Sequence, residues 1–318
     1  MPSAPATVVV ALGGNALAPP GQRVGIAEQF RHTRESLGAV VELAGEGWRI
    51  AIVHGNGPQV GDELERNELA RDQVEPLPLG VLVAATAGWI GYMIQQSLQN
   101  ALRRAGIVRD AVTVVTQTVV DRDAAGATRP VKPIGHALEA AQVDRLRSRG
   151  IPVGRDAAGR WRRLAPTPVP HDIVEAAVVK QLVHEGKIVI AAGGGGPPVY
   201  DDPVLRWEGV DAVVDKDRVA AILALRLEAD TLLLLTDVDG VYRGWGSDTA
   251  ERVARLDVAG AERLLDSGVL GEGSMRPKVE AAVQFVRGGG RRAVIAHLSQ
   301  GPAALRGETG TVIVGSLK

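Results

Sequence analysis

The chain has 318 residues, of which 45% are hydrophobic and 23% charged, with a formal net charge of −1. This length allows a large buried core or two domains. The near-zero charge argues against nucleic acid as the main partner, because binding a phosphate backbone requires a basic surplus. The sequence contains no cysteine, which excludes disulfides, thiolate metal sites and a cysteine nucleophile.

The N-terminal segment, MPSAPATVVVALGGNAL, lacks a basic region and has only a short apolar run. It therefore does not resemble a signal peptide. No stretch approaches the ~18 to 20 apolar residues needed to cross a bilayer. These features predict a cytoplasmic protein that has no membrane partner.

Apolar, β-branched runs alternate with longer helical patterns along the chain. We expect strands at Val8–Leu12, Arg49–Val53, Val112–Val120, Lys187–Ala192, Thr231–Leu235, Arg292–Ala296 and Thr311–Val314. We expect helices at Ala27–Gly45, Leu82–Arg104, Asp172–Glu185, Asp217–Glu228 and Lys278–Arg287. The alternation predicts an α/β fold in which helices cover both faces of a mostly parallel sheet. In such sheets ligands bind beyond the carboxyl ends of the strands.

One segment, Asp121–Pro170, interrupts this alternation. It is rich in Pro, Gly, Arg and Asp, and it is too long for a simple connection in a compact domain. Its pattern predicts an inserted subdomain with a short helix near Leu138–Ser148 and a hairpin around Gly154–Leu164. A disordered surface loop is the alternative. The ordered interpretation is favoured by four apolar residues that could form a small core: Ile134, Val153, Trp161 and Leu164.

Three of the predicted strands end in glycine-rich loops. In chain order these loops hold Gly13, Gly14 and Asn15, then Gly55, Asn56 and Gly57, then Gly193–Gly196. Glycine lets backbone N–H groups approach an anion, and a helix start adds positive potential. A single loop is equally well explained as a turn. Three loops at one sheet edge favour a binding surface for phosphate and a small anionic substrate. The P-loop motif GxxxxGK(S/T) does not occur in the sequence, and the Rossmann motif GxGxxG does not follow the first strand.

Three lysines have unusual neighbours. Lys216 lies between Asp215 and Asp217 where a helix is expected to begin, Lys278 follows a proline at another helix start, and Lys132 lies in the insertion. Phosphoryl transfer between two anions requires cations, because two like charges ~4 Å apart repel by roughly 4 kcal/mol near a protein surface. For each lysine the ordinary alternative is a solvated surface residue. This alternative is weakest for Lys216 and strongest for Lys132.

The segment Leu232–Tyr242, LLLLTDVDGVY, runs from a buried strand directly into an Asp-Gly turn. It is either a tight turn alone or a nucleotide site at the carboxyl end of the strand. The histidines show no metal-ligand spacing, and no Ser-His-Asp set stands out. The sequence therefore points to phosphate chemistry without a histidine metal centre.

Eight strings, taken together, resemble the amino acid kinase family and, within it, the carbamate kinases. They are VVVALGGNAL, HGNGPQVG, WIGYMIQQSL, KPIG, AAGGGGPPV, VVDKDRVAAILA, LLLLTDVDGVY and GSMRPKVEAA. They follow the family's order and span nearly the whole chain. The resemblance implies a three-layer αβα sandwich on an open, mainly parallel sheet, with a small protruding subdomain at 121–170. It also implies a cytoplasmic homodimer that acts in arginine metabolism.

The resemblance further implies reversible phosphoryl transfer between ATP and carbamate. Residues 1–205 would hold carbamate or carbamoyl phosphate, and residues 206–318 would hold the Mg²⁺ nucleotide, with Mg²⁺ bound mainly by nucleotide phosphates. Lys132 would reach carbamoyl phosphate, while Lys216 and Lys278 would stabilise the migrating phosphoryl group. Asp217 would orient these lysines, with Asp215 beside it.

The remaining implied site residues form two groups. The substrate group comprises Gly13, Gly14, Asn15, Gly55, Asn56, Gly57, Gly194 and Gly195. The nucleotide group comprises Asp215, Thr236, Asp237, Val238, Tyr242 and Met275. Because no nucleophile with an adjacent base is found, we expect direct in-line transfer without a phosphoenzyme.

Two positions depart from the family pattern. Ala87 stands where Gln is common, and Arg276 stands where a small residue is frequent. Neither departure removes a residue assigned to the chemistry. Another kinase of the family, acting on a different carboxylate or phosphate acceptor, is the nearest alternative. A non-catalytic binding protein on the same fold is the second alternative.

Overall fold

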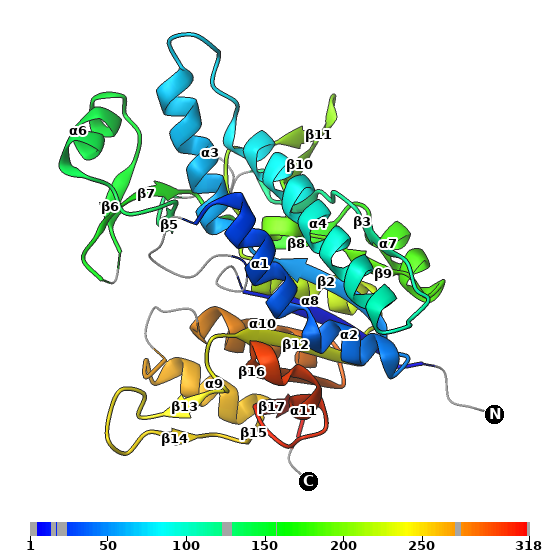
Figure 1. Ribbon diagram of the computed structural model, residues 1–318. Coiled ribbons are helices and arrows are strands. Elements are labelled where there is room, and N and C mark those ends of the chain that lie inside the picture. The colour runs from blue at the N-terminus through cyan, green and yellow to red at the C-terminus, as the bar shows by residue number, and fades with distance from the viewer. Residues whose placement is uncertain are drawn as a thin grey trace.

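The computed structural model describes residues 5–13, 17, 24–122, 129–156, 158–270 and 275–316. Its central feature is an eight-stranded sheet with the order β15-β17-β16-β12-β1-β2-β9-β3 (Figure 1). In chain order its strands are β1 (Thr7–Leu12), β2 (Arg49–His54), β3 (Ala111–Thr113), β9 (Ile188–Ile190), β12 (Thr231–Thr236), β15 (Arg255–Asp257), β16 (Arg292–His297) and β17 (Thr311–Val314). Neighbouring strands run parallel, except for β16 and β17.

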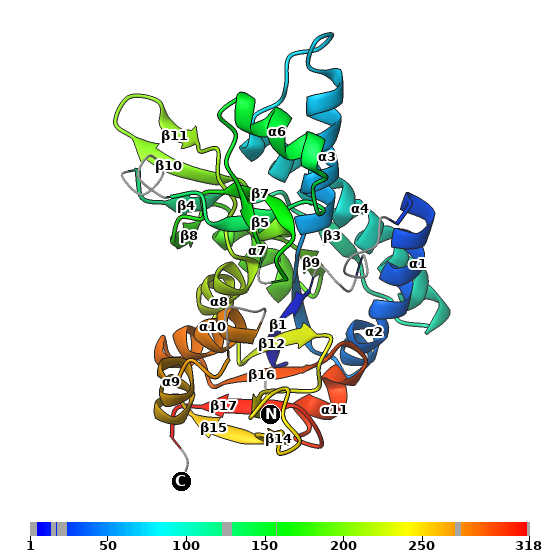
Figure 2. The same cartoon turned by 90° about the vertical axis from the view of Figure 1, so that its left-hand side faces the viewer.

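Helices cover both faces of this sheet, as Figures 1 and 2 show. One face packs against α1 (Ile26–Ser36), α2 (Gly38–Gly45), α4 (Leu79–Arg104) and α11 (Gly301–Leu305). The other packs against α7 (Ala176–His184), α8 (Lys216–Arg226), α9 (Val258–Asp266) and α10 (Met275–Arg287). Side chains alternate along β1, so that Val8 and Val10 join the first core while Val9 and Ala11 join the second. The predicted three-layer αβα architecture is confirmed.

Smaller sheets extend from the central one. A four-stranded sheet with the order β11-β10-β4-β8 comprises β4 (Thr118–Val120), β8 (Pro170–Ile173), β10 (Pro198–Asp202) and β11 (Arg206–Gly209). A two-stranded sheet comprises β13 (Tyr242–Arg243) and β14 (Glu251–Arg252). Short 3₁₀ turns follow two central strands, namely η2 (Gly193–Gly195) and η3 (Leu298–Gln300). No described helix combines the length and the apolar character that a membrane crossing requires.

The predicted insertion contains an antiparallel three-stranded sheet and a helix. Its elements are β5 (Lys132–Ile134), α6 (Ala140–Ser148), β6 (Val153–Arg155) and β7 (Trp161–Ala165), with the sheet order β5-β7-β6. The expected short helix and hairpin are both present. We call β5, α6, β6 and β7 the subdomain.

The subdomain rests on α3 (Gly57–Ala70), which follows β2. The two backbones approach so closely that a Cβ added to Gly61 would lie 2.0 Å from Cα of Gly135. His136 Nε2 lies 3.0 Å from Asp62 Oδ1, and Glu68 forms ion pairs with arginines of the subdomain. Since α3 begins at a strand end, this docking ties the subdomain to the carboxyl edge of the central sheet.

Three element predictions were wrong in part. The expected strand Val112–Val120 is two strands, β3 and β4, in different sheets, because the residues between them bond to other segments: Thr116 accepts from the Ala192 N–H, and Gln117 bonds to Glu175. The helix expected from Asp172 begins only at Ala176, since β8 precedes it. The helix expected at Ala27–Gly45 is divided into α1 and α2. The division of the chain at residues 205 and 206 stays a prediction.

Candidate active site

A cavity of about 860 Å³ opens at the carboxyl ends of β1, β2, β12 and β16. The subdomain forms another part of its wall. The predicted residues that line it are Gly13, Gly55, Asn56, Gly57, Lys132, Gly194, Asp215, Lys216, Asp217, Thr236, Asp237 and Lys278. Residues from positions 13 to 278 thus meet where the parallel sheet predicts a ligand site.

Asp215 organises one side of this cavity. It is the N-cap of α8, and its Oδ1 accepts hydrogen bonds from the backbone N–H groups of Asp217 (3.0 Å) and Arg218 (3.3 Å). Its Oδ2 lies 2.9 Å from Lys132 Nζ of the subdomain. Burial acts to raise the pKa of Asp215, but the charges of Lys132 and Lys216 together with these hydrogen bonds hold it well below its usual value. Asp215 is therefore a carboxylate that both starts a helix and anchors a distant lysine.

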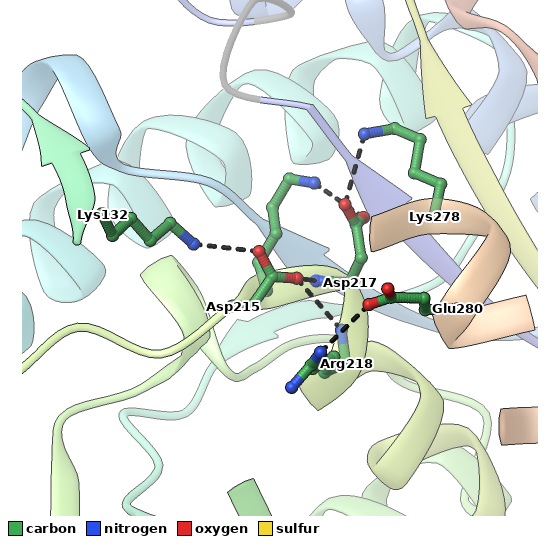
Figure 3. Close-up of polar contacts among 7 residues, drawn as sticks. Lys132, Asp215, Asp217, Arg218, Lys278 and Glu280 are labelled. Carbon is green, nitrogen blue, oxygen red and sulfur yellow. Dashed lines mark hydrogen bonds and ion pairs between the residues drawn. The ribbon is translucent and has the colours of Figure 1, made fainter. Parts of the chain in front are cut away.

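Asp217 holds the other two lysines of the site. Its Oδ1 lies 2.7 Å from Lys216 Nζ and its Oδ2 lies 3.2 Å from Lys278 Nζ (Figure 3). Asp217 and Lys278 are each only 4% exposed, which is unusual for charged residues unless they are paired. Burial lowers the pKa of Lys278, and the neighbouring Lys216 lowers it further, while Asp217 acts in the opposite direction. One carboxylate thus holds two ammonium groups, and this trio carries a net positive charge into the cavity.

A second ion pair lies behind this trio. Arg218 of α8 donates to Glu280 of α10 at 3.0 Å, and Figure 3 shows this contact beside the lysine cluster. Arg276 also donates to Glu280 through Nε at 3.0 Å, and its Nη1 donates to the Leu265 carbonyl. Arg276, one of the two departures from the family pattern, therefore links α10 to the Leu265 carbonyl of α9.

The glycine loop after β9 is set by close packing. Gly194 has φ +67°, and a Cβ there would lie 2.2 Å from Nδ2 of Asn56. Asn56 itself is held by a 2.9 Å hydrogen bond from Nδ2 to Thr86 Oγ1 of α4. Gly195, at φ +89°, packs against the Val214 carbonyl. Glycine is required here because the left-handed backbone and the neighbouring atoms both exclude a side chain.

His54 lies beneath the same loop. It is fully buried, and burial lowers its pKa to about 4 despite hydrogen bonds to the backbone of Gly55 and Ala87. The ring is therefore neutral near pH 7, as expected for a structural histidine. Ala87, the other departure from the family pattern, is 4% exposed and faces Gly193.

Some predicted residues lie elsewhere. Gly14 and Asn15 are outside the described residues. Gly195, Val238, Tyr242 and Met275 are described but do not line the cavity. Tyr242 donates to Asp239 Oδ1 at 2.8 Å and stacks edge-on against Trp245. Met275, the first residue of α10, packs at the border of the core.

The carboxylates of the site fit a metal that arrives with its own ligands. Within the described ranges, no cluster of three or more acidic or histidine side chains could hold a metal ion. Asp215 and Asp217 already accept from lysines. Among the described residues, this donor set therefore does not form a protein cage for Mg²⁺.

The sequence interpretation missed several residues of the cavity wall. Asp156, Arg160 and Arg162 come from the β6–β7 hairpin, and Arg218 and Glu280 come from the helices behind the lysines. The hairpin was predicted, but nothing in its spacing showed that its residues line the same cavity as the lysine cluster. The one available signal was the density of charge in RDAAGRWRR.

Comparisons with known proteins identify the family of this chain. The amino acid kinase family profile matches residues 6–297. The chain is 40% identical over 312 residues to a carbamate kinase of Pyrococcus horikoshii, covering 97% of this chain and 99% of that protein. It is 43% identical over 310 residues to a carbamate kinase of Halobacterium salinarum, with 96% and 97% covered.

Solved structures give the same result. The structure of carbamate kinase from Giardia lamblia bound to citric acid superposes with a TM-score of 0.91 at 33% identity, covering 98% of this chain and 99% of that one. The same Giardia enzyme bound to AMP-PNP gives a TM-score of 0.89 with the same identity and coverage. Both similarities extend over essentially the whole fold, including the subdomain.

Proposed function

Because this chain belongs to the amino acid kinase family and its activity is that of a carbamate kinase, we propose that its lysines stabilise the phosphoryl group as it passes between ATP and carbamate in a single in-line step. The observation that carries this proposal is the pair of ammonium groups on Asp217, at 2.7 and 3.2 Å, on the wall of the cavity. Such fixed cations stabilise charge that spreads over the equatorial oxygens of a transferring phosphoryl group.

In the ATP-forming direction, an oxygen of the ADP β-phosphate attacks the phosphorus of carbamoyl phosphate. The bond from that phosphorus to the carbamate oxygen breaks, and carbamate leaves and yields CO₂ and ammonia. The electron pair of the broken bond stays on the carbamate oxygen. The negative charge that develops during transfer therefore lies on the phosphoryl oxygens and on the leaving-group oxygen. Lys216 and Lys278 face the phosphoryl oxygens in this proposal, and Asp217 orients both ammonium groups.

Lys132 serves the carbamoyl phosphate end of the reaction. Its ammonium lies 2.9 Å from Asp215, and its side chain is about one-third exposed, so the ammonium can move from this carboxylate to an incoming anion. Asp215 in turn remains fixed by the α8 backbone. We therefore assign Lys132 to substrate binding, and we assign Asp215 to positioning the Lys132 ammonium before the substrate binds.

The two substrates divide the cavity between them. Gly13, Asn56, Gly57 and Gly194 offer backbone and amide donors to carbamate or carbamoyl phosphate. Gly55 lines the same part of the cavity, although its own N–H donates to the Leu12 carbonyl. The proposed substrate group also includes Gly14, Asn15 and Gly195. The nucleotide lies at Thr236 and Asp237, and extends beyond the cavity toward Val238, Tyr242 and Met275. Mg²⁺ would be held mainly by the nucleotide phosphates rather than by the protein, and it would neutralise part of their charge.

We further propose that the protein works as a homodimer in the cytoplasm, as its resemblance to the carbamate kinases implies. Sedimentation equilibrium tests the assembly: a mass of one chain at micromolar concentration would contradict the dimer.

The acceptor is tested by comparing phosphoryl donors. ADP and Mg²⁺ are mixed with carbamoyl phosphate or with acetyl phosphate, and ATP is measured. The proposal expects turnover with carbamoyl phosphate to exceed turnover with acetyl phosphate, and no phosphate bound to the protein after exposure to ATP. A trapped phosphorylated side chain would contradict the single-step route, and a preference for acetyl phosphate would contradict the acceptor.

A further inference from the structure

The β6–β7 hairpin brings a pair of arginines to the wall of the cavity. Asp156, Arg160 and Arg162 all line it, together with the lysine cluster of α8 and α10. None of the three belongs to the set of residues assigned above to either substrate. They are the cavity-lining charges of the subdomain besides Lys132.

Asp156 fixes the shape of the hairpin tip. Its Oδ1 accepts from the backbone N–H groups of Ala158 (3.0 Å) and Arg160 (2.9 Å). Its side chain is only 9% exposed. Burial acts to raise the pKa of Asp156, but these hydrogen bonds and the contacts with Arg160 and Arg162 lower it to about 2. Asp156 is therefore ionised at every physiological pH.

The same carboxylate also orients Arg160. Nε and Nη2 of Arg160 lie 3.0 and 2.9 Å from Asp156 Oδ2. A guanidinium has five N–H groups, more than one carboxylate oxygen can accept, so Arg160 retains donors for a second anion. Its side chain is 52% exposed at the cavity wall, which leaves those donors accessible.

Arg162 is occupied differently. Its Nη1 donates to Asp156 at 3.0 Å, and its Nη2 donates to the carbonyl of Gly135, the residue at which the subdomain meets α3. It is 19% exposed. Arg162 thus joins the hairpin to the base of the subdomain, whereas Arg160 lines the cavity and keeps donors that Asp156 does not use.

The Asp156 cluster has the same charge arrangement as the lysine cluster. There, one carboxylate, Asp217, holds two ammonium groups and leaves one net positive charge. Here, one carboxylate, Asp156, holds two guanidinium groups and leaves the same net charge. A carboxylate that holds two cations restricts their movement and still leaves one positive charge, so each unit is pre-organised for an anion. A planar guanidinium also matches phosphate oxygens better than an ammonium does.

We propose that Arg160 is a further substrate-binding residue that contacts phosphate oxygens in this cavity, with Asp156 as the positioning residue that holds its guanidinium. The inference rests on the proposed function, because phosphoryl transfer is what brings phosphates into the cavity. The phosphate belongs either to carbamoyl phosphate or to the nucleotide, and the experiment separates the two.

The test compares Arg160→Gln with Arg155→Gln. Arg155 lies on the same hairpin, stacks on Trp161 at 4.6 Å and does not line the cavity. Both changes remove one positive charge from the same element. KM and kcat are measured for carbamoyl phosphate and for ADP, each with the other saturating. Direct binding of ADP and of inorganic phosphate is measured by titration calorimetry, so that the result does not depend on turnover.

Arg160→Gln is expected to raise the KM of one phosphate substrate about tenfold, which corresponds to about 1.4 kcal/mol. The melting temperature should not change. A rise confined to carbamoyl phosphate places the contact on that substrate, and a rise confined to ADP, matched by weaker ADP binding, places it on the nucleotide. Arg155→Gln should stay within about twofold of the unaltered protein.

Asp156→Asn tests the positioning role. It should raise the same KM by a smaller factor, and the double variant with Arg160→Gln should be no worse than Arg160→Gln alone, because both act through one guanidinium. The inference is overturned if Arg160→Gln changes neither KM nor the binding of ADP or phosphate, or if Arg155→Gln has the same effect. Absence of ATP formation by the unaltered protein would refute the proposed function instead, and the calorimetric comparison would still decide the role of Arg160.

Discussion

The ammonium of Lys132 lies 2.9 Å from Oδ2 of Asp215, although the two residues are 83 positions apart. This contact links β5 of the subdomain to the first turn of α8. The lysine proposed to bind carbamoyl phosphate is therefore held by the same carboxylate that starts the helix bearing Lys216 and Asp217. The position of the subdomain and the geometry of the lysine cluster are coupled through one side chain.

Lys132→Met should lower kcat/KM for carbamoyl phosphate by about a hundredfold, because a charge-assisted contact to the substrate is lost. It should also change the pH dependence of stability. Lys132 helps to depress the pKa of Asp215 in the folded state, so its stabilising effect is present above the ordinary aspartate value of 3.8 and is lost as pH falls.

Urea unfolding at several pH values measures this effect. The expected difference in free energy of unfolding between the unaltered protein and Lys132→Met is about 1 kcal/mol near pH 7, since Lys132 is partly exposed. It should shrink as pH falls below about 4. A difference that grows toward acid pH would contradict the account.

Lys278 should set the alkaline limit of activity. Burial and the charge of Lys216 lower its pKa below the ordinary lysine value of 10.5. Between the lowered pKa and 10.5, the folded state binds fewer protons at Lys278 than the unfolded state does, so stability rises with pH in this window. Activity that requires the Lys278 ammonium falls over the same window. A plot of kcat against pH from 7 to 10.5 should decline before 10.5. A flat profile up to that pH would exclude Lys278 as an essential cation.

The contact between Gly61 and Gly135 should govern how the subdomain sits on α3. Gly61→Ala places a Cβ 2.0 Å from Cα of Gly135, so the two backbones must separate. Gly88→Ala in α4 is the matched control, because its Cβ meets nothing within 4 Å and alanine favours a helix by up to about 1 kcal/mol.

Kinetics of the two alanine variants provide the test. Gly61→Ala should raise the KM for carbamoyl phosphate at least tenfold, as the displaced subdomain carries Lys132 away. Gly88→Ala should leave both KM values unchanged. If Gly61→Ala is as active as Gly88→Ala, the docking contact does not position the site.

Gly194 offers a second paired comparison. Gly194→Ala and Gly150→Ala both introduce a side chain at a left-handed backbone, at φ +67° and +71°, and each should cost about 1 kcal/mol of stability. Only the Cβ at Gly194 meets Asn56, at 2.2 Å from Nδ2. Activity should therefore fall at least tenfold in Gly194→Ala alone. Equal losses in the two variants would point to backbone strain rather than to displacement of Asn56.

Much of the scaffold could be predicted from local pattern. The cores of β1, β2, β12 and β16 are apolar runs that any parallel sheet requires, and each ends at the positions where polar or glycine residues begin. The individual lysines could also be singled out, because Lys216 has carboxylates on both sides and Lys278 opens a helix. These are properties of neighbouring residues, which sequence displays directly.

Relationships across the fold could not be predicted in the same way. Nothing in the local sequence pairs Lys132 with Asp215 or brings Arg160 to the cavity that the lysines line, since both depend on how the subdomain rests on α3. The expected strand Val112–Val120 failed for a similar reason. Its polar centre at Thr116 and Gln117 bonds to distant segments, and these long-range contacts outweigh the local β propensity.

The most direct test of the lysine cluster is the rate of ATP formation from ADP, Mg²⁺ and carbamoyl phosphate in the unaltered protein, in Lys216→Ala and in Lys180→Ala. Lys180 of α7 is the control because it forms an ion pair with Glu228 and does not line the cavity. The account predicts rapid ATP formation that falls by at least a hundredfold in Lys216→Ala and is unchanged in Lys180→Ala. Full activity in Lys216→Ala would contradict the central role of the ammonium pair on Asp217.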